Sequence, residues 1–363
     1  MKTFDYRELP PELFCADIMA LVAAIHEEKG RAEHFLSSGS SALKVLSEQA
    51  RITSATASNR IEKIYASDER IAEIARGGVE LKTQGESEIA GYLDLYDTIR
   101  DNYDHIPVAP SYILEMHRAL FQYTDAPFAG QWKENDILVL EENEDSGEMT
   151  KADWEKLVQR QRRTYEPVSA YETPLAMGAL CDTLAEAVEL QVYDPLLLIA
   201  LFNLDFACTR PFTNGNGRMN RLLALLMLDR AGFTVGNFIS LEEGIAADAD
   251  EYRRALRESS VRWRDNMNAS KPFVSFFLSH VLAAYRGLAA HARKAEDVGS
   301  ISKADRVRLL FEHNLGQLSK REIAQECPDI SIATIEAALG GMVREGFLAK
   351  VGAGKGTRYV RNR

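Results

Sequence analysis

Two strongly apolar stretches joined by a short polar segment constrain this chain more than any other feature. Residues 194–209 (DPLLLIALFNLDFACT) are apolar nearly all round, and residues 222–233 (LLALLMLDRAGF) are similar up to Gly232. A helix that is apolar on every side is buried inside a protein rather than lying on its surface. The sequence therefore predicts two buried helices, joined by the segment TRPFTNGNGRMNR at 209–221.

Helical spacing of apolar residues covers most of the remaining chain and predicts an all-α fold, a helical bundle. Gly30 is expected to end a first helix at 12–30, and Ser54, Thr56 and Ser58 are candidate N-caps of a short helix that runs through Glu62. Further helices are expected at 87–103, 111–123, 173–191, 250–267 and 272–296.

Residues 130–149 depart from this pattern. Ile137 to Leu140 are β-prone and Asn143 to Gly147 are turn-like. This combination predicts a small β-hairpin or flap.

The composition is that of an ordinary soluble protein with a sizeable core, with 363 residues, 46% hydrophobic and 27% charged. No uninterrupted apolar run approaches the ~18 residues that span a bilayer, and the first residues carry no signal-peptide pattern. We expect a cytoplasmic protein without a membrane partner. Its four cysteines are isolated, which argues against disulfides and a structural zinc.

The charge is unevenly distributed along the chain. Residues 301–363 hold 11 Lys and Arg against 7 Asp and Glu, whereas the whole chain has a net charge of −11. Three expected helices and two short strands around VGAGKG at 351–356 follow a linker at 296–305. This order predicts a C-terminal winged helix-turn-helix.

The function of that module stays open between two classes. Basic residues lie in or beside the expected wing and could contact DNA phosphates: Lys350, Lys355, Arg358, Arg361 and Arg363. The expected recognition helix at 331–346 is poor in side chains that read base edges. The alternatives are DNA binding and protein interaction, including a homodimer.

The segment 209–221 has the residues of an oligophosphate site. Gly215 and Gly217 allow positive φ, so that consecutive N–H groups can converge on an anion. A helix begins there, and its N-terminus attracts negative charge. Arg218 and Arg221 are three residues apart and fall on one face of its first turn.

The segment resembles the signature of the Fic family, H-P-F-x-[D/E]-G-N-G-R-x-x-R. Seven positions match: Pro211, Phe212, Gly215, Asn216, Gly217, Arg218 and Arg221. The resemblance implies a helical bundle with a β-hairpin flap and transfer of AMP from ATP to a target hydroxyl. It also implies that the 215–217 backbone holds the α and β phosphates and that Arg218 and Arg221 neutralise the β and γ phosphates.

Two positions depart from the signature. Arg210 replaces the histidine that acts as general base, and an arginine guanidinium donates hydrogen bonds but accepts no proton. Asn214 replaces the acidic Mg²⁺ ligand, and a neutral amide oxygen is a weaker ligand for that ion. Losing a general base removes about 10²–10⁴-fold of rate. Arg210 also adds positive charge, which favours phosphate binding without transfer.

Three explanations of Arg210 remain open. It is a natural degeneration, an introduced inactivating change, or a neighbour that leaves another base to act. The seven histidines lie outside the motif and are read as surface or core residues.

The segment ASNRIEK at 57–63 is similar to the family's inhibitory motif [S/T]-x-x-x-E-[G/N]. Ser58 and Glu62 are in register, and Lys63 departs at the last position. The resemblance implies a bidentate ion pair between Glu62 and Arg221, which withdraws the donor needed by the γ-phosphate. ATP would then bind unproductively.

The expected organisation is an N-terminal helical region with the inhibitory segment at 1–104, a Fic core at 105–295 and a winged helix-turn-helix at 301–363. The expected function is that of a protein adenylyltransferase-family member that binds ATP, with Mg²⁺ as a possible cofactor. Its transfer activity is impaired or lost, and an unknown protein target docks on the flap by strand addition. The alternatives are a nucleotide-sensing DNA-binding regulator and a scaffold without catalysis.

Overall fold

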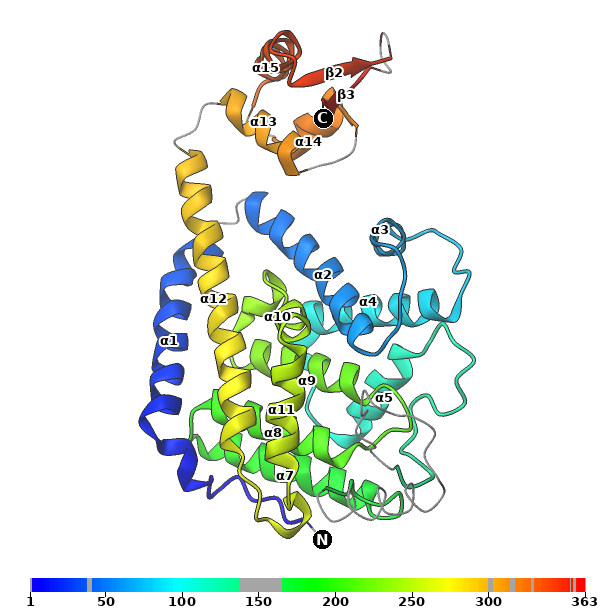
Figure 1. Cartoon of the computed structure of the whole chain (residues 1–363), viewed down its shortest axis with the longest axis vertical. Helices are drawn as coiled ribbons and strands as arrows, with labels where there is room; N and C mark the ends of the chain where they lie inside the picture. Colours follow the sequence, from blue (N-terminus) through cyan, green and yellow to red (C-terminus); the bar gives the residue numbers. More distant parts are fainter. Residues whose placement is uncertain are drawn as a thin grey trace, which may run out of the picture. The chain divides into compact units, whose positions relative to one another are not determined.

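The structure, a computed structural model, describes residues 2–37, 41–137, 165–299, 303–313, 317–327, 330–352, 354 and 357–362. Its elements are almost all helices, with one small antiparallel sheet near the C-terminus (Figure 1). The expected all-α fold with a small β component is confirmed. The flap expected at 130–149 lies largely outside the described residues.

The described contacts divide the chain into two compact units. The first contains residues 1–31 and 46–288, and the second contains 32–45 and 289–363. The domain boundaries expected at 104/105 and between 295 and 301 are not tested by this division and stay predictions. The segment 209–221 and the segment that carries Ser58 and Glu62 both belong to the first unit.

The helices of the first unit, of which α1, α2 and α12 continue into the second, have the following bounds: α1 (Ala16–Ser37), α2 (Ser41–Ile61), α3 (Asp68–Arg76), α4 (Gln84–Asn102), α5 (Pro110–Leu120), α7 (Thr173–Leu190), α8 (Pro195–Thr209), α9 (Asn216–Arg230), α10 (Leu241–Ala247), α11 (Ala249–Ser260) and α12 (Lys271–Gly299). Short 3₁₀ helices accompany them: η1 (Pro11–Phe14), η2 (Tyr103–His105), η3 (Thr234–Asn237) and η4 (Trp263–Asp265).

Helices α8 and α9 form the centre of this unit, as their all-round apolar composition predicts. Every residue of α8 from Leu196 to Phe206 is buried, and so is every residue of α9 from Arg218 to Asp229. Helices α7, α4 and α11 pack against this pair. The centre therefore presents one polar edge, the loop between α8 and α9.

Two predicted helix ends are wrong. Gly30 was expected to end the first helix, but α1 runs on to Ser37. Ser54, Thr56 and Ser58 were expected as N-caps, but they lie inside the continuous helix α2. Thr56 Oγ1 donates to Ile52 O at 2.8 Å, so its hydroxyl is satisfied within the helix rather than at a cap.

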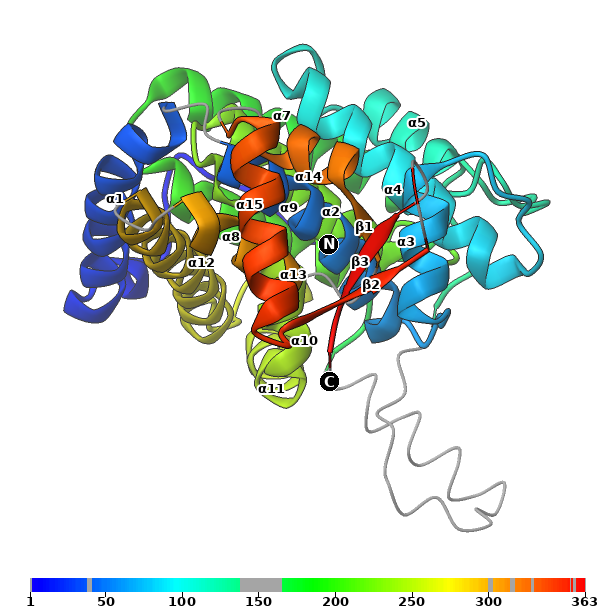
Figure 2. The ribbon, with the colours of Figure 1, turned by 90° about the horizontal axis from the view of Figure 1, so that it is seen from above.

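The second unit has its own core and a three-stranded sheet. It contains α13 (Lys303–His313), β1 (Leu318–Ser319), α14 (Lys320–Glu326), α15 (Ile332–Arg344), β2 (Leu348–Val351) and β3 (Arg358–Arg361). The strand order is β1-β3-β2, all antiparallel, with Lys350 opposite Tyr359 (Figure 2). A capping box of Ser319 and Glu322 starts α14. The three helices and two strands expected in the tail are present.

One described helix is long and apolar enough to cross a membrane by length and composition. The sequence did not indicate it, because only uninterrupted apolar runs were considered there. Within residues 271–293 of α12, the most apolar window of 18 residues has a mean hydropathy of 1.4, because the charged residues there are few and widely spaced. However, 56% of the most apolar window is buried inside the protein, as in the core helix of a soluble protein. The helix is therefore weak evidence for a membrane segment.

Candidate anion site and its carboxylate partner

The loop between α8 and α9 turns twice through left-handed backbone. Arg210 ends α8 with φ 46°, and Gly215 precedes α9 with φ 78°. A Cβ on Gly215 would lie 2.9 Å from Phe121 Cε2. Glycine is therefore required at 215 for both its backbone conformation and its close packing.

Side chains hold the loop in this shape. Asn216 Oδ1 accepts from Phe212 N at 2.9 Å, and its Nδ2 donates to Phe212 O at 2.6 Å. The ring of His117 is stacked on Phe212 with centroids 3.7 Å apart. The Asn216 side chain thus closes the loop, which leaves the backbone of 215–217 as the part that can face an anion.

His117 supports the loop in its neutral form. Its Nδ1 accepts from Gly130 N at 2.9 Å, so Nε2 carries the proton and donates to Asn214 O at 3.0 Å. Burial lowers the pKa of His117 to about 4, although the hydrogen bond to Asn214 opposes this shift. His117 is a core residue, one of the two positions, surface or core, expected for the histidines outside the motif.

Arg221 is held by two residues of the predicted inhibitory motif. Its Nε donates to Ser58 Oγ at 2.8 Å and its Nη2 to Ser58 O at 3.0 Å. Glu62 Oε1 lies 2.9 Å from the same Nη2. The pair between Glu62 and Arg221 is present, but it has one hydrogen bond rather than the bidentate geometry expected, because Ser58 takes the other donor.

The Glu62 carboxylate also lies against the backbone of the anion loop. A Cβ placed on Gly217 would overlap with Glu62 Oε1. The carboxylate therefore stands at the first turn of α9, where free N–H groups and the helix dipole favour negative charge. Burial is the largest single influence on Arg221 and lowers its pKa, but Glu62, Tyr252 and Tyr92 together outweigh burial and raise that pKa.

Arg218 has a different environment from Arg221. Its side chain is fully buried, and its Nη2 lies 2.7 Å from Glu88 Oε2 of α4. Its Nη1 lies 3.3 Å from Asn59 Oδ1, and its guanidinium stands over the ring of Phe121. Burial lowers the pKa of Arg218, and Glu88 opposes this. These contacts make Arg218 a link between α9, α4 and α2.

Asn214 and the described residues around it do not fit a site that binds Mg²⁺ through protein side chains alone. Asn214 is exposed, and its Oδ1 accepts from Gly215 N at 2.6 Å instead of facing outward as a ligand. Within the described part of the chain, no three His, Cys, Asp or Glu side chains are grouped so as to bind a metal. Magnesium is bound through carboxylates and phosphates.

Arg210 stands at the other end of the loop. The last carbonyls of α8 are capped by two side chains: the half-buried Tyr165 donates to Cys208 O at 2.6 Å, and the buried Lys133 donates from Nζ to Thr209 O at 3.2 Å. Lys133 N also donates to Pro211 O at 2.9 Å. These bonds fix the backbone around Arg210.

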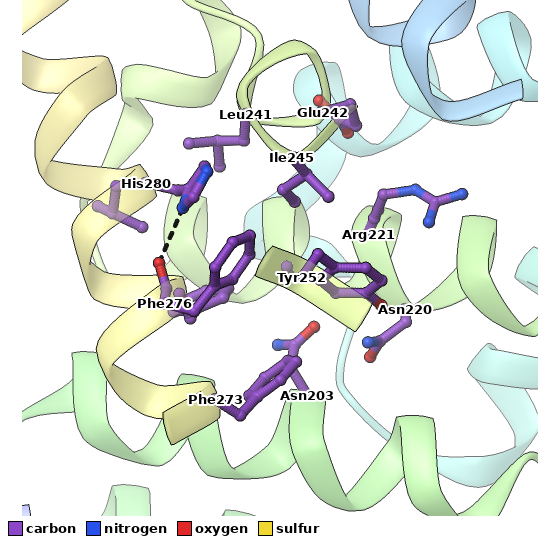
Figure 3. Close-up of a pocket in the computed structure, with 13 residues that line it drawn as sticks. Asn203, Asn220, Arg221, Leu241, Glu242, Ile245, Tyr252, Phe273, Phe276 and His280 are labelled. Atoms are coloured by element: carbon purple, nitrogen blue, oxygen red, sulfur yellow. Dashed lines mark hydrogen bonds between the residues drawn. The ribbon is translucent and has the colours of Figure 1, made fainter. Parts of the chain in front are cut away.

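A cavity of about 30 Å³ lies beside Arg221, between α8, α9, α10, α11 and α12 (Figure 3). Asn203, Asn220 and Tyr252 are among the residues that line it, and the Oδ1 of Asn220 is buried without a hydrogen-bond partner in the described structure. Its volume corresponds to one or two water molecules. It is too small for a nucleotide.

The structure thus brings together Ser58, Glu62, Gly217 and Arg221, as the sequence predicted. It adds five residues that the sequence did not single out: Asn59, Glu88, His117, Lys133 and Tyr252. Asn59 lies within the inhibitory motif, which could have indicated its role. The other four carry no local signal, because their contacts depend on how distant helices pack.

Comparisons with known proteins assign part of the chain to a family and support its fold. Residues 107–228 match the model of the Fic/DOC family. A search of curated proteins found no match. Among solved structures, a Fic family protein from Desulfovibrio desulfuricans G20 is 20% identical, with a TM-score of 0.60 over 98% of each chain.

Two further structures are similar. A Fic domain containing signaling protein from Bacteroides thetaiotaomicron VPI-5482 is 18% identical, with a TM-score of 0.57 over 77% of this chain and 98% of that one. A segment of Fic-1 from C. elegans is 21% identical, with a TM-score of 0.58 over 77% of this chain and 74% of that one. At these identities the similarity shows the fold. Together with the family model, it identifies residues 107–228 of this chain as a domain of the Fic/DOC family.

Proposed function

We propose that this chain binds ATP or a related nucleotide at the loop before α9, that Glu62 restrains this binding, and that AMP transfer is impaired or lost. Domains of this family generally carry transferase activity of the AMP-transfer type. The observation that carries the proposal is the Glu62 carboxylate, which occupies the first turn of α9 and pairs with Arg221.

The restraint follows from competition between oxyanions. A carboxylate and a phosphate accept hydrogen bonds from the same guanidinium and backbone donors, so both cannot occupy them at once. Ser58 holds two further donor contacts of Arg221 in place. Nucleotide phosphates would therefore bind in full only when Glu62 moves away.

The impairment of transfer follows from the first half of the loop. No proton acceptor stands at 210, and Asn214 provides a backbone-bonded amide instead of a carboxylate. The unprotonated nitrogen of His117, Nδ1, already accepts a hydrogen bond from Gly130 N, so His117 does not replace the base. A target protein, docked on the flap, would not be activated by a neighbouring base.

Mass spectrometry for added adenylate tests this proposal on three full-length proteins: the parent, Arg210→His and Arg210→His/Glu62→Gly. With ATP and Mg²⁺ or Mn²⁺, we expect no adenylate on the parent and the most on the double variant. Adenylate on the parent would contradict the loss of transfer. Calorimetry measures ATP binding by the same proteins, and failure of both the parent and the double variant to bind ATP would contradict nucleotide binding.

DNA binding by the second unit is a second proposal, supported by its element order of helix, strand, two helices and two strands. Three of its basic side chains are paired with carboxylates: Arg308 with Glu345, Lys320 with Glu336 and Arg358 with Glu322. These pairs leave less positive charge for phosphates. An electrophoretic shift that weakens steeply with salt would support DNA binding, and its absence at low salt would favour a protein contact such as dimerisation.

A further inference from the structure

Among the three arginines of residues 209–221, Arg210 is the one whose side chain has no polar partner in the part of the chain that the structure describes. Its backbone N–H donates to Phe206 O at 3.1 Å, and its left-handed backbone, costly for a residue with a Cβ, is imposed by the end of α8. Its side chain makes no hydrogen bond or ion pair with the described residues, and its Nε is buried without a partner. Arg210 is half-buried as a whole, and its Nε is a buried donor without an acceptor. Such donors are rare, because they lose their hydration without replacement.

The neighbours of Arg210 add positive charge instead of balancing it. Lys133 is buried beside it, and burial lowers the pKa of Lys133 to about 8; Asp136 opposes the shift, and Arg210 and Arg264 add to it. Arg264 has its own partner in Glu172 at 2.8 Å. Arg210 and Lys133 are therefore two like charges close together, and no carboxylate among the described residues is bonded to either of them.

Arg221, at the other end of the segment 209–221, has the partner that Arg210 lacks. Glu62 neutralises Arg221 at 2.9 Å. Burial raises the pKa of Tyr252, and the positive charges of Arg221 and Arg210 both oppose that shift. Two cationic groups that act on one hydroxyl match an anion with adjacent negative charges.

We infer that Arg210 is a second oxyanion-binding group, so that the segment 209–221 takes a ligand whose phosphate chain reaches from Arg221 to Arg210. The inference rests on the nucleotide binding proposed above and names its ligand class, a nucleoside polyphosphate or a free polyphosphate. A planar guanidinium binds phosphate through two parallel hydrogen bonds. Arg210 then determines specificity: it holds a phosphate where a transferase would admit a neutral hydroxyl.

Calorimetry of the full chain with sodium tripolyphosphate, ATP and adenosine tests this assignment. The proteins are Glu62→Gln, which frees Arg221, and Glu62→Gln combined with Arg210→Gln, Arg210→Lys or Arg31→Gln. Arg31 is an exposed residue of α1 that is paired with Glu27 and Glu28, so its variant removes the same charge away from the loop. Urea unfolding of each protein confirms that it is folded.

We expect Arg210→Gln to weaken tripolyphosphate and ATP about tenfold or more, as for a lost charged hydrogen bond. Arg210→Lys should retain part of the affinity, Arg31→Gln all of it, and adenosine should not respond to Arg210. Equal affinity of Arg210→Gln and its parent for both anions, or no tripolyphosphate binding by Glu62→Gln, would overturn the assignment.

The two proposals fail separately. ATP binding that is indifferent to Arg210 would overturn the subsite and leave nucleotide binding standing. Tripolyphosphate binding that depends on Arg210, without any ATP binding, would support the subsite and contradict the nucleotide function.

Discussion

The Glu62 carboxylate lies 2.9 Å from Nη2 of Arg221 and in contact with the first turn of α9. The pair joins the C-terminal end of α2 to the start of α9. Because Arg221 is buried, its charge needs an anion at this place. In this structure the anion belongs to the protein, so a phosphate has to compete with it.

Gly217 should resist replacement although it lies in a helix. Gly217→Ala would overlap with Glu62 Oε1, break the pair with Arg221 and lower the free energy of unfolding by about 1–3 kcal/mol. Gly178→Ala in α7 is the matched control, because its Cβ meets nothing within 4 Å and should stabilise by about 0.5–1 kcal/mol. Equal stabilisation of both variants in urea unfolding would show that Glu62 is not seated against Gly217.

Lys63 should strain the segment that carries Glu62. Its φ of 60° is left-handed, at the position where the resembling motif has Gly or Asn. Lys63→Gly should raise the free energy of unfolding by about 1 kcal/mol relative to Lys63→Ala, which keeps the strain. Urea unfolding measures the difference, and Lys63→Gly no more stable than Lys63→Ala would contradict the strain.

Arg218 and Glu88 should act on stability. Glu88→Gln leaves the buried guanidinium of Arg218 without its carboxylate, and Arg218→Met leaves the buried carboxylate of Glu88 without its guanidinium. Each variant should lower the free energy of unfolding by about 3–5 kcal/mol. Arg218→Met/Glu88→Leu should cost clearly less than the sum. In a double-mutant cycle, Arg253→Gln and Asp250→Asn form the control pair, which is exposed and should show no coupling. Additive losses at 218 and 88 would contradict the link.

His117 should make the fold sensitive to acid. Its pKa in the folded protein is about 4, below the ordinary value of 6.5. The unfolded chain therefore binds a proton that the folded protein excludes, and stability falls as pH decreases from about 6.5 to 4. Between pH 7 and 4 the free energy of unfolding should drop by about 3 kcal/mol more in the parent than in His117→Gln. Parallel profiles of the two proteins would contradict this.

The sequence predicted the centre of the fold because composition alone requires α8 and α9 to be buried. It also predicted the pairing of Glu62 with Arg221, because a resembling motif fixes both positions. It missed Glu88, since only the packing of α4 against α9 brings this carboxylate to Arg218. As a result, Arg218 was expected at phosphates rather than in a buried pair.

The boundaries of α2 show a second limit of local patterns. Ser54, Thr56 and Ser58 are typical of helix starts, yet tertiary contacts hold them inside a long helix. Ser54 Oγ donates to Ser240 at 2.9 Å, and Ser58 accepts from Arg221. A residue type that favours caps remains in a helix when another helix provides its hydrogen-bond partner.

The competition between Glu62 and phosphate is tested most directly by the affinity of the full chain for ATP, measured by calorimetry on the parent, Glu62→Gln and Glu48→Gln. Glu48 lies on α2, the helix that ends just before Glu62; it is largely exposed and controls for the charge change. We predict that Glu62→Gln binds ATP about tenfold or more tightly than the parent, and that Glu48→Gln binds it like the parent. Equal affinity of Glu62→Gln and the parent would contradict the account.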